Sequence, residues 1–214
     1  HKAIRRQRQM CIRDSTIGGH NMFRKMRRYK QALELTECID ILKKEVRGVL
    51  SVIGDGGYPY GVPIDYWYDE SNGCIYFHGA KEGHKIDALR ACDKASFCVY
   101  DEGFRNEGEW ALNIRSVIAF GHVKPVTDKV RTLEICSQLC RKFTDSKEYI
   151  DNEIAKSAPS VMCLEFTPEH ITGKMVNESS FYYLRLLPML GLIKCSSEYF
   201  HIASEPSCVL SLRL

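Results

Sequence analysis

The stretch YFHGAKEGHK, from Tyr76 to Lys85, joins a predicted strand to a predicted helix and is the most informative segment of this chain. Its aromatic start is typical of a strand, and a helix is predicted over residues 82–91, directly after a loop that contains glycine. Glycines ahead of a helix leave backbone N–H groups free to bind an anion. Lys81, His84 and Lys85 add positive charge at the same place. The segment therefore fits two interpretations, a phosphate-binding loop or a solvated basic first turn.

Hairpin turns and short apolar runs surround this segment across residues 22–178. Turn-forming sequences occur at 55–57 (DGG) and 71–73 (SNG). Periodicity predicts strands over 49–53, 60–68, 74–78, 95–100, 114–123, 161–166 and 171–174, and helices over 36–47, 82–91 and 128–143. Pro59 and Pro63 place the second of these strands at a sheet edge or a bulge. Because long helices do not alternate regularly with the strands, the pattern predicts a mainly β fold, an antiparallel β-barrel with flanking α-helices.

The composition is typical of a globular protein. Of the 214 residues, 44% are hydrophobic and 27% are charged, which excludes a fibrous or wholly disordered chain. No run of about 18 apolar residues occurs without a charge, so no membrane partner is expected. The formal net charge of +3 is too small to indicate a nucleic-acid partner. It also resides in the flanks, because residues 22–178 carry a slight acidic excess.

The two flanks differ in composition from the middle of the chain. Residues 1–21 are rich in Arg and lack the apolar core of a secretory signal. Because residues 10–15 (MCIRDS) resemble translated adapter sequence, we interpret residues 1–21 as a non-native or disordered leader, with translation starting at Met22; a mitochondrial presequence is the alternative. Residues 179–214 form a hydrophobic tail of uncertain origin, either an arm that packs on a partner or out-of-frame sequence.

Ten cysteines are many for this length, but no CxxC pair occurs among them. A zinc knuckle or a thioredoxin-like pair is therefore not indicated, and no metal site is predicted. Cys136 and Cys140 lie four residues apart on one predicted helix, which places them on one face. We predict that the cysteines within residues 22–178 are reduced thiols in the core of a cytoplasmic protein.

Three motifs in a fixed order resemble a known family. They are GYPYGVP at 57–63, YFHGAKEGHK at 76–85 and RSVIAFG at 115–121. Together they resemble the FMN-binding split-barrel family related to pyridoxamine 5′-phosphate oxidases, and within it the nitroimidazole-resistance (NimA-like) reductases, over about residues 24–175. The resemblance implies a six-stranded split β-barrel that forms a homodimer and binds FMN at the dimer interface.

The resemblance also implies which residues contact the cofactor. These are Val62, Pro63, Ile64, His78, Gly79, Lys85, Arg115 and Ser116. Lys85 stands where the oxidases hold the FMN phosphate, whereas His84 replaces a neighbouring arginine there and weakens that contact. His78 is the candidate catalytic residue, because an imidazole beside the flavin could donate a proton to a reduced substrate. The alternatives for His78 are a cofactor contact alone, or no role in the site.

The function implied by the resemblance is that of an FMN-dependent oxidoreductase. NAD(P)H would drive the two-electron reduction of a small acceptor such as a nitroaromatic compound. The chain lacks the C-terminal Trp and Arg-Leu-His segment of the true oxidases, so pyridoxamine phosphate oxidation is not expected. The alternative is a non-enzymatic flavin- or haem-binding split barrel, in which His78 or His84 would be an axial haem ligand.

Overall fold

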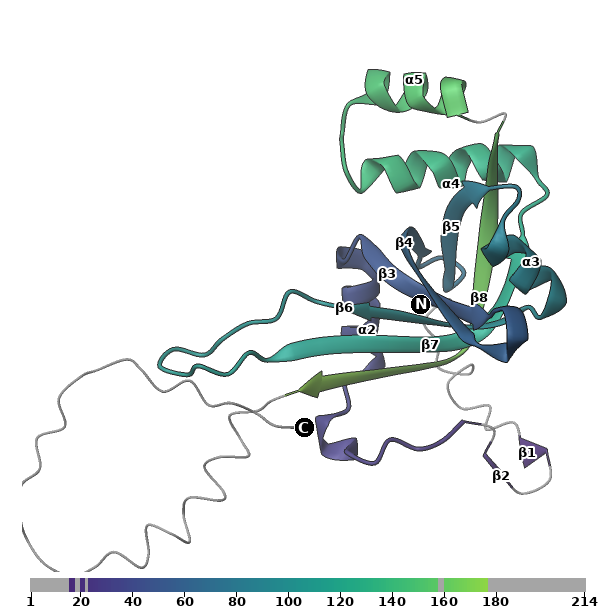
Figure 1. Ribbon diagram of the computed structural model, residues 1–214. Helices are drawn as coiled ribbons and strands as arrows, with labels where there is room; N and C mark the ends of the chain where they lie inside the picture. The colour runs from purple at the N-terminus through teal and green to yellow at the C-terminus, as the bar shows by residue number, and fades with distance from the viewer. Residues whose placement is uncertain (1–15, 18–19, 22, 158–159, 177–214) are drawn as a thin grey trace, which may run out of the picture. The chain divides into compact units, whose positions relative to one another are not determined.

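The computed structural model describes residues 16–17, 20–21, 23–157 and 160–176, and six of its strands close into one barrel (Figure 1). Around the barrel the strands follow the order β3-β4-β5-β8-β7-β6, and each neighbouring pair is antiparallel. Their bounds are β3 Arg47–Ile53, β4 Pro59–Asp69, β5 Cys74–Ala80, β6 Lys94–Tyr100, β7 Ile114–Pro125 and β8 Val161–Val176. The six-stranded barrel predicted from the sequence is thereby confirmed.

Alternation along the strands builds the barrel core. In β3, Gly48, Leu50 and Val52 are buried while the residues between them are partly exposed, which is the period-two pattern of a strand with one face inward. Aromatic side chains from the other strands fill the interior, where the rings of Phe97 and Tyr66 meet edge to face with centroids 4.9 Å apart.

Helices cover the barrel at separate places. The main helices are α2 Leu35–Lys44, α3 His84–Ala91, α4 Lys129–Arg141 and α5 Lys147–Ser157, and short 3-10 turns occupy Tyr29–Gln31 (η1) and Asp55–Gly57 (η2). Helix α2 inserts Cys38, Ile41 and Leu42 into the barrel core. Helices α4 and α5 lie beside one another next to β4, β5 and the start of β8 (Figure 1). There α4 packs Ile135 and Leu139 in a second, smaller cluster.

Several predicted element bounds are wrong. Helix α2 ends at Lys44, and Arg47 and Gly48 belong to β3 instead of ending the helix. Helix α3 begins at His84 rather than residue 82, because Gly83 precedes it with φ 114°, outside the helical region. Residues 161–166 and 171–174 form one continuous strand, β8, whose pairing with β7 shifts register next to Gly121.

Helix α5 was not predicted at all. It buries only Ile150, so its apolar periodicity is weak, and its packing against α4 supplies the support that the local sequence lacks.

Most of the predicted leader and all of the predicted tail fall outside the described residues. Within the predicted leader, β1 (Thr16–Ile17) and β2 (His20–Asn21) pair as a separate two-stranded antiparallel sheet. The other residues of the leader, and all of the predicted tail 179–214, lie outside the described part of the chain. The interpretation of both flanks therefore stays a prediction.

Candidate functional site

The barrel splits where β4 and β5 part. Residues 66–69 of β4 pair with residues 74–77 of β5, but the first half of β4 pairs only with β3. On the other side, His78, Gly79 and Ala80 pair only with β8. Both prolines of β4 lie in the half that pairs with β3 but not with β5, which confirms the predicted edge, because proline has no N–H to donate to a neighbouring strand.

A pocket of about 290 Å³ opens at this split, between the two strands and helices α4 and α5. Its apolar wall consists of Leu139, Phe143, Ile154 and Val161. Polar and thiol groups face the same space, and they come from Asp65, His78, Glu153, Cys136 and Cys140. His78 is the one predicted site residue that lines the pocket. Its side chain is exposed, as a group that acts on a ligand must be.

Lys85 lies directly against Gly79, as expected for two residues of one binding loop. A Cβ atom built on Gly79 would stand 3.0 Å from the Lys85 Nζ, so the glycine leaves the space that the ammonium occupies. Burial lowers the pKa of Lys85, and no carboxylate of the described residues forms an ion pair with it. A half-buried cation without a counter-ion, at the start of α3, is suited to bind an anionic group such as a phosphate.

His84 faces away from this cation and toward the turn between β3 and β4. Its ring stacks on Tyr60 with centroids 4.2 Å apart, and its Nε2 lies 3.7 Å from the Asp55 carboxylate. The backbone N–H of Asp55 also donates to His84 Nε2 at 3.4 Å. His84 therefore holds the η2 turn against α3, and these contacts give it a packing role.

The half of β4 that pairs with β3 but not with β5 contains Val62, Pro63 and Ile64, next to the pocket residue Asp65. Ile64 points into the barrel core, Pro63 faces outward and Val62 is half-buried. The backbone of this half-strand has no partner strand on the side of β5. Its geometry fits the predicted role of backbone contacts to a flat ligand, while Asp65 is held by Arg47 at 2.6 Å.

Arg115 and Ser116 do not join this group within one chain. Ser116 pairs with Lys174 near one end of β8, whereas His78 pairs with Cys163 near the other end. At about 3.3 Å per residue, the two positions are on the order of 35 Å apart along the strand.

Arg115 is held in place by a buried carboxylate. Its Nε donates to Asp101 at 2.7 Å, and its backbone N–H donates to the same carboxyl at 2.8 Å. Burial alone would raise the pKa of Asp101, but these hydrogen bonds outweigh it and lower the pKa. This pairing fixes the start of β7.

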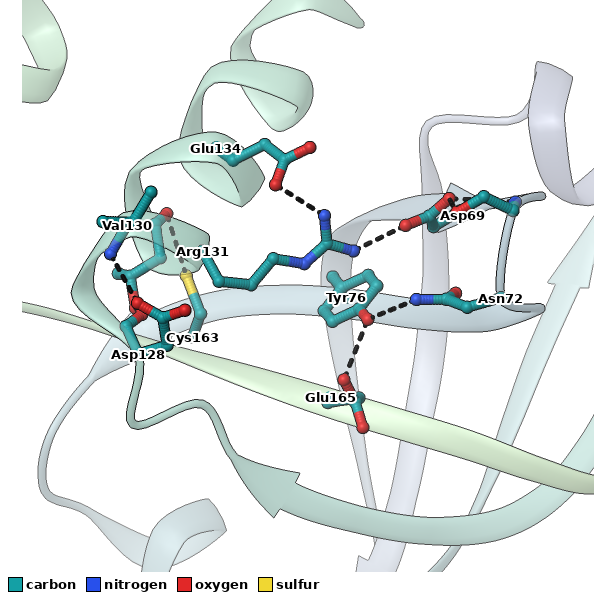
Figure 2. Close-up of polar contacts among 11 residues, drawn as sticks. Asp69, Asn72, Tyr76, Asp128, Val130, Arg131, Glu134, Cys163 and Glu165 are labelled. Atoms are coloured by element: carbon teal, nitrogen blue, oxygen red, sulfur yellow. Dashed lines mark hydrogen bonds and ion pairs between the residues drawn. The ribbon is translucent and has the colours of Figure 1, made fainter.

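A polar network that was not predicted from the sequence fastens α4 to the β4–β5 hairpin (Figure 2). Arg131 donates to Asp69 at 2.5 Å and lies over the ring of Tyr76, 4.8 Å from its centroid. The Tyr76 hydroxyl in turn donates to Glu165 at 2.8 Å and accepts from Asn72 at 2.9 Å.

The network sets the wall of the pocket, because α4 carries Leu139 and the two pocket cysteines. Burial would raise the pKa of Asp69, but hydrogen bonds from Ser71 and Arg131 outweigh it and lower the pKa. In the sequence, Asp69 stands two residues before the turn-forming SNG at 71–73, and this pattern ordinarily indicates a solvated loop.

Two kinds of site do not occur among the described residues. None of their helices is long and apolar enough to cross a membrane. The same part of the chain contains no group of three or more His, Cys, Asp or Glu side chains placed to share a metal ion.

Comparison with known proteins extends these findings. A sequence profile of the pyridoxamine 5′-phosphate oxidase family matches residues 34–175. No curated protein matches the chain.

Solved structures share the fold at low sequence identity. A candidate 5-nitroimidazole antibiotic resistance protein from Bacteroides thetaiotaomicron VPI-5482 is 16% identical with a TM-score of 0.57, over 67% of this chain and 86% of that one. The flavocytochrome Anf3 from Azotobacter vinelandii is 15% identical with a TM-score of 0.59, over 88% and 89% of the two chains. A FAD and haem binding protein from Mycobacterium smegmatis is 14% identical with a TM-score of 0.54, over 86% and 93%.

Proposed function

The chain belongs to the pyridoxamine 5′-phosphate oxidase family, and we propose that it is a flavoprotein that holds FMN at the split between β4 and β5. The observation that carries this proposal is Lys85, a half-buried ammonium against Gly79 without a carboxylate partner among the described residues. An FMN phosphate is an anion of the kind that this cation fits. The free edge formed by Val62, Pro63 and Ile64 would lie along the flavin ring.

We also propose that the working unit is a homodimer, because one chain does not bring the predicted site together. Arg115 and Ser116 on β7 pair near one end of β8 and His78 on β5 pairs near the other end, so Arg115 and Ser116 would reach the flavin bound by a second copy. Each site would then use residues from both chains.

The outer face of the barrel supports this arrangement. Pro63, Val49, Cys98, Ile118 and Thr172 pair in this order across β4, β3, β6, β7 and β8, and all five are at least partly exposed. Among the described residues this outer ladder is a mostly apolar, partly exposed stripe, as is typical of a face that is buried on dimerisation.

The proposed reaction is the NAD(P)H-driven reduction of a small acceptor such as a nitroaromatic compound. A bound flavin supplies two-electron transfer between nicotinamide and acceptor. The chain's own residues do the rest. Leu139, Phe143 and Ile154 would exclude water from one face of the acceptor, and His78 would donate a proton to it. We propose the cytoplasm as the compartment, since the seven cysteines of the described residues are free thiols.

A second candidate is a flavin- or haem-binding protein without enzymatic turnover. Two structures with the same fold are described as a flavocytochrome and as a FAD and haem binding protein. The exposed His78 beside the pocket is the residue that could ligate a haem iron.

The test is an anaerobic reduction assay on the full chain loaded with FMN. We expect NADH or NADPH to bleach the flavin absorbance, and a nitroaromatic acceptor to restore it with loss of the nitro compound. Flavin that is bound but not reduced by either nucleotide would contradict the enzymatic proposal. A Soret band on haem addition, absent from a His78→Ala variant, would favour the second candidate.

A further inference from the structure

A cysteine that lines the pocket is in sulfur–sulfur contact with a buried cysteine. The Sγ atoms of Cys136 on α4 and Cys163 on β8 are 3.8 Å apart. We propose that Cys136 and Cys163 form an oxidisable dithiol, which a hydroperoxide that enters the pocket converts to a disulfide. This assignment does not depend on the bound cofactor.

Access differs between the two sulfurs. Cys136 is partly exposed and lines the pocket, so a small molecule in the pocket can reach it. Cys163 is fully buried and does not line the pocket, and its Sγ lies 3.8 Å from the backbone carbonyl of Thr132 on α4 (Figure 2). The oxidant would therefore meet Cys136 first, and Cys163 would act second.

The pKa shifts of the two thiols favour the same order of reaction, with Cys136 first. The contact with the Cys163 sulfur lowers the pKa of Cys136, which favours the nucleophilic thiolate. The same contact, together with burial, raises the pKa of Cys163 and keeps it protonated.

Cys140 provides an internal comparison. It lines the same pocket one helical turn further on, but burial raises its pKa. Of these two pocket thiols, Cys136 is therefore the one whose ionisation is favoured.

The chemistry balances with one hydroperoxide per pair. The Cys136 thiolate attacks the terminal oxygen of the hydroperoxide, the O–O bond breaks, and an alcohol (or water, from hydrogen peroxide) leaves with one proton. The sulfenic acid formed on Cys136 is then attacked by the Cys163 sulfur. This step forms the S–S bond and releases water, so two electrons have passed from the thiols to the peroxide.

The product would link α4 covalently to β8. A disulfide requires its sulfurs at about 2.05 Å, so the two sulfurs must approach from their present contact distance of 3.8 Å. Both elements line the pocket, through Leu139 and Val161. His78 is paired directly with Cys163 across β5 and β8, so the link would form beside the candidate catalytic residue.

The test is peptide mapping of the reduced full chain after treatment with one equivalent of cumene hydroperoxide and alkylation of the remaining thiols. We expect a Cys136–Cys163 cross-linked peptide as the main product in the native chain and in the control Cys140→Ser. In Cys163→Ser, dimedone should label Cys136 as a trapped sulfenic acid, and in Cys136→Ser no cross-link should form.

Other oxidation patterns would overturn the proposal. Cys136 should be oxidised first, so oxidation of Cys140 or of the half-buried Cys98 at an equal rate would contradict the proposal. A native chain in which Cys163 remains fully alkylated after Cys136 is oxidised also contradicts it. Because both results are read on the native chain, a variant that fails to fold does not affect the conclusion.

Discussion

Lys85 is the residue on which the proposed FMN binding would depend most. Its ammonium lies against Gly79, half-buried and without a carboxylate partner among the described residues. A hydrogen bond to a charged group contributes about 1.5–3 kcal/mol, so Lys85→Ala should weaken FMN binding by roughly 10- to 100-fold. Fluorescence titration with FMN measures this. Arg90→Ala is the matched control, because Arg90 lies on the same helix and pairs only with Asp87 there. Equal affinity in Lys85→Ala and in the native chain would remove Lys85 from the site.

His78 is expected to affect turnover more than binding. Its exposed imidazole lines the pocket, where loss of a proton donor costs about 100-fold in rate. His78→Asn should therefore retain FMN but reduce the acceptor about 100-fold more slowly, as stopped-flow kinetics would show. The control is His122→Asn, because His122 pairs with Asp93 and does not line the pocket. Unchanged kinetics in His78→Asn would leave the residue only a structural or cofactor contact.

The candidate site could be predicted from the sequence only in part. His78, Gly79 and Lys85 stand close together in one motif, so their proximity follows from a short loop. The pocket wall could not be predicted, because it forms where α4 and α5 meet β4 and β5, far away in sequence. Such contacts depend on packing between elements, and local periodicity does not encode them.

Helix α4 is the element that links the fold to the site. Arg131 fastens it to the hairpin through the buried Asp69, and removal of the guanidinium would leave that carboxylate unpaired. Arg131→Met should lower the free energy of unfolding by about 2 kcal/mol, which urea denaturation would measure. Arg141→Met, at the end of the same helix, should change it little. A loss of equal size in both variants would contradict the structural role of the network.

The sequence predicted some strands and helices better than others. Alternation located strands such as β3 and β7, which have one buried and one more exposed face, whereas β5 begins with four consecutive buried residues and was recognised by its apolar, aromatic run. The continuity of β8 was missed, since a strand interrupted by Pro168 has the sequence pattern of two strands. Helix α5 was missed because tertiary packing, and not its own periodicity, supports it.

At the scale of the whole molecule, the proposed site is built from two copies of the chain. The outer ladder carries Ile118, which is 37% exposed on β7. Ile118→Lys should place a charge in the proposed interface, so light scattering should show a monomer and the flavin should be lost with it. Val130→Lys is the control, because Val130 is 76% exposed on α4 and lies outside the ladder. A variant that stays dimeric with full flavin content would contradict the proposed interface.

Flavin content is the most direct test of the central claim. The absorption spectrum of the full chain, purified and then loaded with excess FMN and desalted, measures it. We predict flavin bands near ~450 nm at one FMN per chain, as expected for a protein whose chemistry is supplied by this cofactor. A colourless protein after desalting, with the fold intact by circular dichroism, would contradict the account.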